Sequence, residues 1–143
     1  MKDLKKSISN MGVRQQFKMD KFDWCVTIYY TVDEDQKIEI MKYLKELGCD
    51  DDTSCSIAKN LSKAKEDTGF TYSSYKNQCS IVVIHKASSI GEFINTFEHE
   101  KNHLEMHICE ALDITPYSEE AAHMSGDLAQ MILEKALYSI VEL

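Results

Sequence analysis

Proline and glycine are scarce in this chain of 143 residues, which contains one proline and five glycines. This composition excludes collagen-like sequences and Pro- or Gly-rich linkers, and we find no internal repeat or low-complexity segment. No apolar run approaches the roughly 18 residues that a membrane-spanning helix needs. The first residues are charged and precede no apolar stretch, so we expect no signal peptide, no membrane partner and a cytoplasmic location.

Basic residues are fewer than acidic ones: the chain has 16 Lys and Arg and 24 Asp and Glu, which gives a formal net charge of −8. An acidic surface repels phosphate backbones, so nucleic acid is not an expected partner. The five cysteines are odd in number and form no C-x-x-C pair, which favours free thiols in a reducing compartment. The C-x5-C spacing of Cys49 and Cys55 is too loose to indicate a metal site by itself.

The remaining composition is that of one folded domain, with 43% hydrophobic and 28% charged residues. Residues 1–21 are polar and lack clean periodicity, and we assign them to an N-terminal arm that is a loose helix or partly disordered. Residues 22–143 are assigned to a single domain. Its fold class is predicted as α+β, with a small, mostly antiparallel sheet packed on long helices.

The first half of this domain predicts a strand followed by two helices. Residues 24–32 alternate and are rich in β-branched and aromatic side chains, as is typical of a strand. Asp33 and Gln36 have the spacing of a capping box, and Gly48 is placed to end the helix behind them. After an acidic loop at 50–52, a second helix is expected near 56–66.

The second half predicts a hairpin and two further helices. Residues 69–75 and 79–86 read as its strands, and the continuous apolar run from Ile81 to Ile84 is typical of a strand covered on both faces. Ser89 has the position of a cap for a long helix over about 90–112. The last helix is expected to begin with Thr115 as its cap and Pro116 at its first position.

The residues 99–103 read His-Glu-Lys-Asn-His inside the long predicted helix. Positions i and i+4 lie on one face of a helix, so His99 and His103 can bind one zinc ion. Glu100 projects about 100° around the helix axis from His99, which lets it reach a water molecule at the metal as the general base. The two histidines lie beside the apolar face of the helix and not among its exposed charges. We therefore predict one Zn²⁺ per chain.

An open zinc site needs a third protein ligand, and the next helix offers two candidates. Glu119 borders a stripe of small and apolar residues on that helix, whereas Glu120 falls on its polar side. We therefore predict Glu119 as the third ligand and keep Glu120 as the alternative. His107 continues the histidine row, but eight residues of helix span about 12 Å, which is too far for one ion. His107 and His123 are candidates for roles in supporting a ligand or orienting substrate.

An H-E-x-x-H helix followed by a helix that begins Glu119-Glu120-Ala121-Ala122-His123 resembles the gluzincin group of zinc metallopeptidases. The run from Ser80 to Ile108 also looks like small H-E-x-x-H proteins carried by bacteria and their phages. The resemblance covers about residues 69–135. It implies a zincin-like fold, with His99, His103 and Glu119 as ligands and Glu100 as base. It departs from the family in the short spacing before Glu119, in His123 standing where an acidic residue is common, and in the lack of a large C-terminal domain.

Three hypotheses follow. The first is a zinc metallopeptidase that cleaves a peptide or protein substrate with zinc-activated water and Glu100 as base, and that aligns the peptide on the edge of strand 79–86. The second is a catalytically silent zinc-binding module of a phage or mobile element that docks a partner protein. It is motivated by the small size and by the departures from the family. The third is a structural helical domain without metal.

Overall fold

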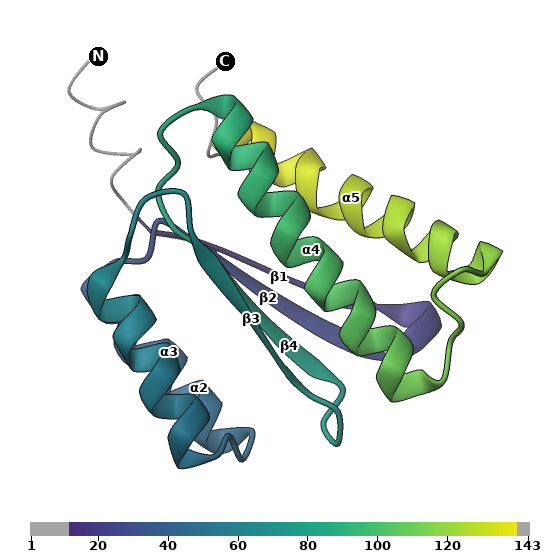
Figure 1. Ribbon diagram of the computed structural model, residues 1–143, viewed down its shortest axis with the longest axis horizontal. Helices are drawn as coiled ribbons and strands as arrows, with labels where there is room; N and C mark the ends of the chain where they lie inside the picture. The colour runs from purple at the N-terminus through teal and green to yellow at the C-terminus, as the bar shows by residue number, and fades with distance from the viewer. Residues whose placement is uncertain (1–11, 140–143) are drawn as a thin grey trace.

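A four-stranded mixed sheet lies between two pairs of helices in the computed structural model, which describes residues 12–139 (Figure 1). The strands are β1 (Val13–Met19), β2 (Trp24–Tyr30), β3 (Gly69–Ser74) and β4 (Cys79–Ile84), in the spatial order β1-β2-β4-β3. β1 and β2 pair antiparallel, β2 and β4 pair parallel, and β4 and β3 pair antiparallel. The predicted α+β class is confirmed, and the sheet is mixed because one of its three pairings is parallel.

The helices α2 (Glu34–Glu46) and α3 (Asp51–Lys63) cover one face of the sheet, while α4 (Ile90–Leu112) and α5 (Glu119–Ser139) cover the other (Figure 1). α4 lies over β3 and β4, and α5 lies against α4 and β1. Within the described part of the chain, no helix is long and apolar enough to cross a membrane. The sheet order thus puts β3 at one edge, beside α4, and α5 toward the opposite edge.

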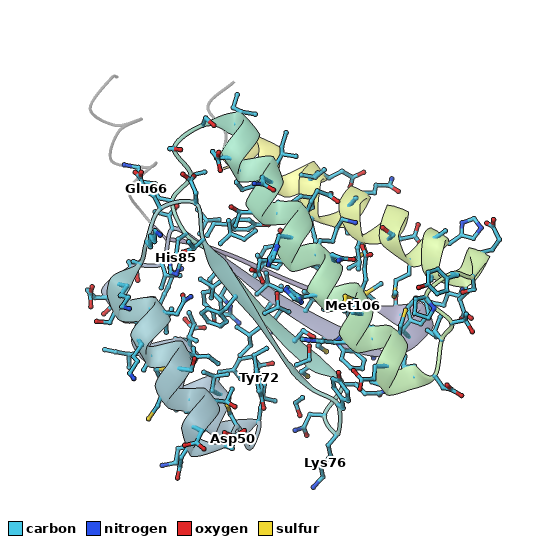
Figure 2. All side chains as sticks on the ribbon, in the orientation of Figure 1. Asp50, Glu66, Tyr72, Lys76, His85 and Met106 are labelled. Carbon is cyan, nitrogen blue, oxygen red and sulfur yellow. The ribbon has the colours of Figure 1, made fainter. Side chains whose placement is uncertain are left out.

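The alternation of side chains on the central strands divides the core in two. Val82 and Ile84 of β4 pack with α4 and α5, whereas Ile81 and Val83 pack with α2 and α3. Tyr72 of β3 lies between its strand and the α2–α3 pair (Figure 2). The prediction of a strand covered on both faces is confirmed for β4. Because β4 is bonded to β2 on one side and β3 on the other, it has no free edge, and the prediction that its edge receives a peptide is wrong.

The residues at the helix ends explain where α2 and α4 begin and end. Asp33 accepts a hydrogen bond from the Gln36 backbone N–H, and the Gln36 side chain bonds back to the Asp33 backbone, so the predicted capping box is confirmed. Gly48 follows α2 with a φ of 78°, a left-handed conformation that glycine adopts at little cost. Ser89 accepts from the Glu92 backbone N–H at the start of α4.

The structure differs from the prediction in the N-terminal arm and at the starts of α3 and α5. Residues 13–19, which the sequence places in the arm, form β1 because they pair along the whole of β2; residues 1–11 lie outside the described residues. α3 begins at Asp51, earlier than expected, because the Asp50 carboxylate accepts from the Thr53 N–H and caps it. α5 begins at Glu119, later than expected, because Thr115–Ser118 forms a turn and Ser118 Oγ accepts from Ala121 N–H.

Candidate metal centre

Glu100 of the H-E-x-x-H residues contacts the edge strand β3, and His99 and His103 lie beside it on α4, with the His99 side chain 67% exposed. The Nε2 atoms of His99 and His103 lie 3.2 Å apart, and the ring centroids are 4.8 Å apart. A tetrahedral zinc ion with Zn–N bonds of about 2.0–2.1 Å separates two ligand nitrogens by about 3.3–3.4 Å. The two imidazole nitrogens are thus within hydrogen-bond distance of each other and close to the separation that a shared zinc ion requires. The helix brings them together because residues four apart share a face.

Glu100 lies beside this pair and is almost completely buried, at 4% exposure. The Thr71 hydroxyl of β3 donates a hydrogen bond of 2.6 Å to Glu100 Oε2, while Oε1 lies 4.0 Å from His99 Nε2. Oε1 has no hydrogen-bond partner among the described residues. Every fully buried side-chain oxygen or nitrogen atom of these residues has a hydrogen-bond partner. Because Oε1 has none, it must retain contact with solvent. One carboxylate oxygen is thus held by β3 and the other is available to accept a proton.

A recess of about 240 Å³ opens beside His99 and Glu100, between the start of β3 and α4. Asp67, Gly69, Asn95 and Thr96 contribute to its lining. A Cβ atom on Gly69 would lie 2.2 Å from the Val83 carbonyl oxygen and 3.3 Å from Glu100 Cγ. Glycine is therefore required where β3 passes the Glu100 side chain, and the recess is large enough for several water molecules or a small group of a ligand.

His107, one turn beyond His103, bonds to β3 and not to its histidine neighbours. Its Nδ1 atom lies 2.7 Å from Ser73 Oγ, and its ring centroid is 6.3 Å from that of His103. Burial lowers the pKa of His107, and the adjacent His103 lowers it further, while Glu110 acts in the opposite direction. The sequence made His107 a candidate for supporting a ligand or orienting substrate, and it held no signal that Ser73 would be its partner.

The structure does not bring Glu119 or Glu120 to the histidine pair. The Glu119 side chain is 92% exposed and lies 3.8 Å from His123, whose side chain is 74% exposed. Among the residues described, no three His, Cys, Asp or Glu side chains are grouped closely enough to hold a metal ion. Glu100 and His107 of α4 contact β3, whereas α5 lies against α4 and β1, and the exposed Glu119 lies apart from the histidine pair.

Lys101, inside the motif, has a structural role that the sequence did not reveal. Its side chain is buried between α4 and α5, where Nζ donates to Glu105 Oε1 at 2.6 Å and to Ser125 Oγ at 2.9 Å. The motif therefore contacts both neighbours of α4: Glu100 bonds to β3, and Lys101 joins α4 to α5. A lysine at spacing i, i+4 from a glutamate is a signal for such a pair, but only packing shows that it is buried.

Comparisons with known proteins identify no relative. The chain matches no protein-family model, no curated protein and no solved structure.

Proposed function

We propose that this protein is a small zinc-dependent hydrolase that cleaves peptide bonds, with His99 and His103 as zinc ligands and Glu100 as general base. The observation that carries the proposal is the 3.2 Å separation of the two Nε2 atoms beside a buried carboxylate. These donors fit zinc in chemical type and spacing. A zinc ion in this position supplies Lewis acidity, which favours ionisation of water and polarises a carbonyl group.

Glu100 then accepts the proton of the attacking water through Oε1 and returns it to the leaving amine. Thr71 fixes the carboxylate through Oε2, so that the base does not have to be oriented during the reaction. The edge strand β3 replaces β4 as the proposed peptide-binding strand, because among the described residues β3 pairs with β4 alone, and it runs past Glu100.

Metal analysis and one substitution test this proposal. Protein purified without added zinc or chelator should contain one zinc per chain, and His99→Ala or His103→Ala should lose it. Glu100→Gln should keep zinc and the Thr71 hydrogen bond but lose hydrolysis of a peptide library by at least about a hundredfold. Glu98→Gln, an exposed change on the same helix, is the control and should behave as wild type. Unchanged cleavage by Glu100→Gln contradicts the mechanism.

The third ligand is a separate proposal. We keep Glu119 as the proposed residue and Glu120 as its alternative, and either must approach the histidines from the exposed first turn of α5 when zinc binds. Glu119→Gln should then weaken zinc affinity about 10- to 100-fold or more, and Glu120→Gln should not. Equal zinc affinity in both variants and wild type would remove α5 from the site.

A zinc-binding module without catalytic activity is the second candidate. It is favoured by the near-complete burial of Glu100 and by its bond to Thr71, since both also suit a carboxylate that only fixes α4 to β3. In that case the protein binds zinc and a partner protein, as a module of a phage or mobile element would. Zinc at one per chain with no cleavage of any peptide in the library would select this candidate over the hydrolase.

A further inference from the structure

A chain of hydrogen bonds runs from the buried core of the sheet to His107. The Trp24 indole Nε1–H donates to Ser80 Oγ at 2.8 Å, Ser80 Oγ lies 2.7 Å from Ser73 Oγ, and Ser73 Oγ lies 2.7 Å from His107 Nδ1. Trp24 and Ser80 are both completely buried. The chain therefore connects β2, β4, β3 and α4, and its inner end has no solvent-exposed surface.

The direction of every hydrogen in this chain follows from its first member. An indole N–H can only donate, so Ser80 Oγ accepts from Trp24. A buried hydroxyl must place its own hydrogen on an acceptor, and the only one within reach among the described residues is Ser73 Oγ. Ser73, whose oxygen accepts from Ser80 in this arrangement, is then oriented to donate to His107 Nδ1, which lies 2.7 Å away. A neutral imidazole that accepts at Nδ1 carries its hydrogen on Nε2.

His107 Nε2 has no hydrogen-bond partner among the described residues. Every fully buried side-chain nitrogen of these residues has one, so His107 Nε2 must retain contact with solvent. With hydrogen on Nε2 and Nδ1 already occupied, neither ring nitrogen is available as a metal ligand. The ring instead presents a neutral hydrogen-bond donor one turn beyond His103. A donor of this kind suits a carbonyl oxygen.

The place where His107 contacts β3 indicates which backbone carbonyl of a bound peptide its Nε2–H can reach. Glu100 bonds to Thr71 and His107 bonds to Ser73, so the two α4 residues contact β3 two residues apart. An extended peptide paired with β3 has the same repeat of about 3.3–3.4 Å per residue. A substrate whose scissile bond lies at Glu100 therefore has a backbone group two residues away beside His107.

We propose that His107 is a substrate-positioning residue that donates its Nε2–H to a backbone carbonyl of an extended peptide, about two residues from the cleaved bond. This inference rests on the proposed peptidase function. It assigns the Trp24–Ser80–Ser73 chain the role of fixing the tautomer of His107. It also excludes His107 as a third zinc ligand.

The tautomer is tested by long-range ¹H–¹⁵N NMR spectra of the full chain at neutral pH, without any substrate. The ¹⁵N shifts of the two ring nitrogens distinguish the protonated nitrogen from the unprotonated one. We expect His107 to carry its hydrogen on Nε2 in wild type and to populate both tautomers in Ser73→Ala, where the donor to Nδ1 is lost. Hydrogen on Nδ1 in wild type overturns the assignment, whether or not the protein is an enzyme.

The substrate contact is tested with His107→Phe, and with His107→Gln as the variant that retains a donor. His107→Phe should keep one zinc per chain and raise KM about 3- to 10-fold for peptides that extend at least two residues to both sides of the cleaved bond. Its kcat should change less than its KM, and His107→Gln should recover part of the loss. Loss of zinc in His107→Phe, or an unchanged KM, overturns the proposal. A zinc-loaded wild type that cleaves no peptide overturns the proposed function, while the NMR result still decides the tautomer.

Discussion

At the scale of single residues, the packing of β3 depends on two small residues, Thr71 and Gly69. Thr71 supplies the hydroxyl that holds the Glu100 carboxylate, and Gly69 allows β3 to approach the Val83 carbonyl of β4 and the Glu100 side chain closely. Each has a conservative replacement that separates its role from a general loss of structure. Both predictions can be checked by urea unfolding without any assumption about catalysis.

Thr71→Val keeps the size of the side chain but removes its hydroxyl. The nearly buried Glu100 carboxylate then loses its only side-chain hydrogen-bond donor among the described residues, and the free energy of unfolding should fall by about 1–3 kcal/mol. Thr71→Ser retains the hydroxyl and should lose less than half as much. Equal losses in the two variants would show that the hydroxyl does not stabilise Glu100.

Gly69→Ala adds a Cβ atom 2.2 Å from the Val83 carbonyl oxygen, a position that the backbone cannot accept without moving. We expect a loss of about 1–3 kcal/mol in the free energy of unfolding. Gly126→Ala is the matched control, because a Cβ there meets nothing within 4 Å on an exposed face of α5. That variant should be more stable than wild type by about 0.5–1 kcal/mol. Two variants of equal stability would contradict the tight fit at Gly69.

At the scale of elements, α4 is fixed on both sides by polar contacts. On the β3 side it uses Glu100 and His107, and on the α5 side it uses Lys101. These contacts determine the direction in which the histidine-bearing face of α4 points. The rotation of α4 about its axis is therefore a property of the packed protein and not of the helix alone.

Replacing Lys101 with Met should disturb the contact between α4 and α5. Glu105 would lose its partner in a place where its side chain is only 17% exposed, and we expect a loss of about 3 kcal/mol in the free energy of unfolding. The double variant Lys101→Met, Glu105→Met should recover most of it, because no unpaired charge remains. Lys59→Met, on an exposed face of α3, should change stability by less than about 0.5 kcal/mol. A double variant no more stable than Lys101→Met would argue against an ion pair.

At the scale of the whole molecule, two histidines on opposite faces of the sheet connect stability to pH. His85 is buried on the α3 side, with its Nε2 atom 2.7 Å from Asn60 Oδ1, and His107 lies on the α4 side. Figure 2 shows His85 near the end of the sheet close to α3. Burial is the main cause that lowers the pKa of each ring, and the charge of Lys37 lowers the pKa of His85 further.

Stability should therefore fall as the pH decreases through about 6.5, the pKa of an unperturbed histidine. Below that value the unfolded chain binds protons that the folded protein binds only at lower pH, so the unfolded state is favoured. The loss ends below the lowered pKa values of the folded protein. His85→Gln should make the slope of unfolding free energy against pH shallower between pH 5 and 7. An unchanged slope in this variant would show that His85 does not contribute.

Sequence patterns alone predicted the elements whose causes are local. The capping box at Asp33 and Gln36 is confirmed because its donors and acceptors lie within one turn of the chain. The two-sided burial of Ile81 to Ile84 is confirmed because a continuous apolar run leaves no solvated face. The pairing of His99 with His103 follows from helical geometry and is found at 3.2 Å.

Only the tertiary structure decided which groups meet these residues, because such contacts join segments far apart in the sequence. Strand β1 is polar along much of its length and is recognised only by its pairing with β2. The strand order places β3, not β4, at the edge beside α4, and so makes Thr71 and Ser73 the partners of Glu100 and His107. The same packing leaves Glu119 exposed at the start of α5, and it brings no third ligand to the histidine pair among the described residues.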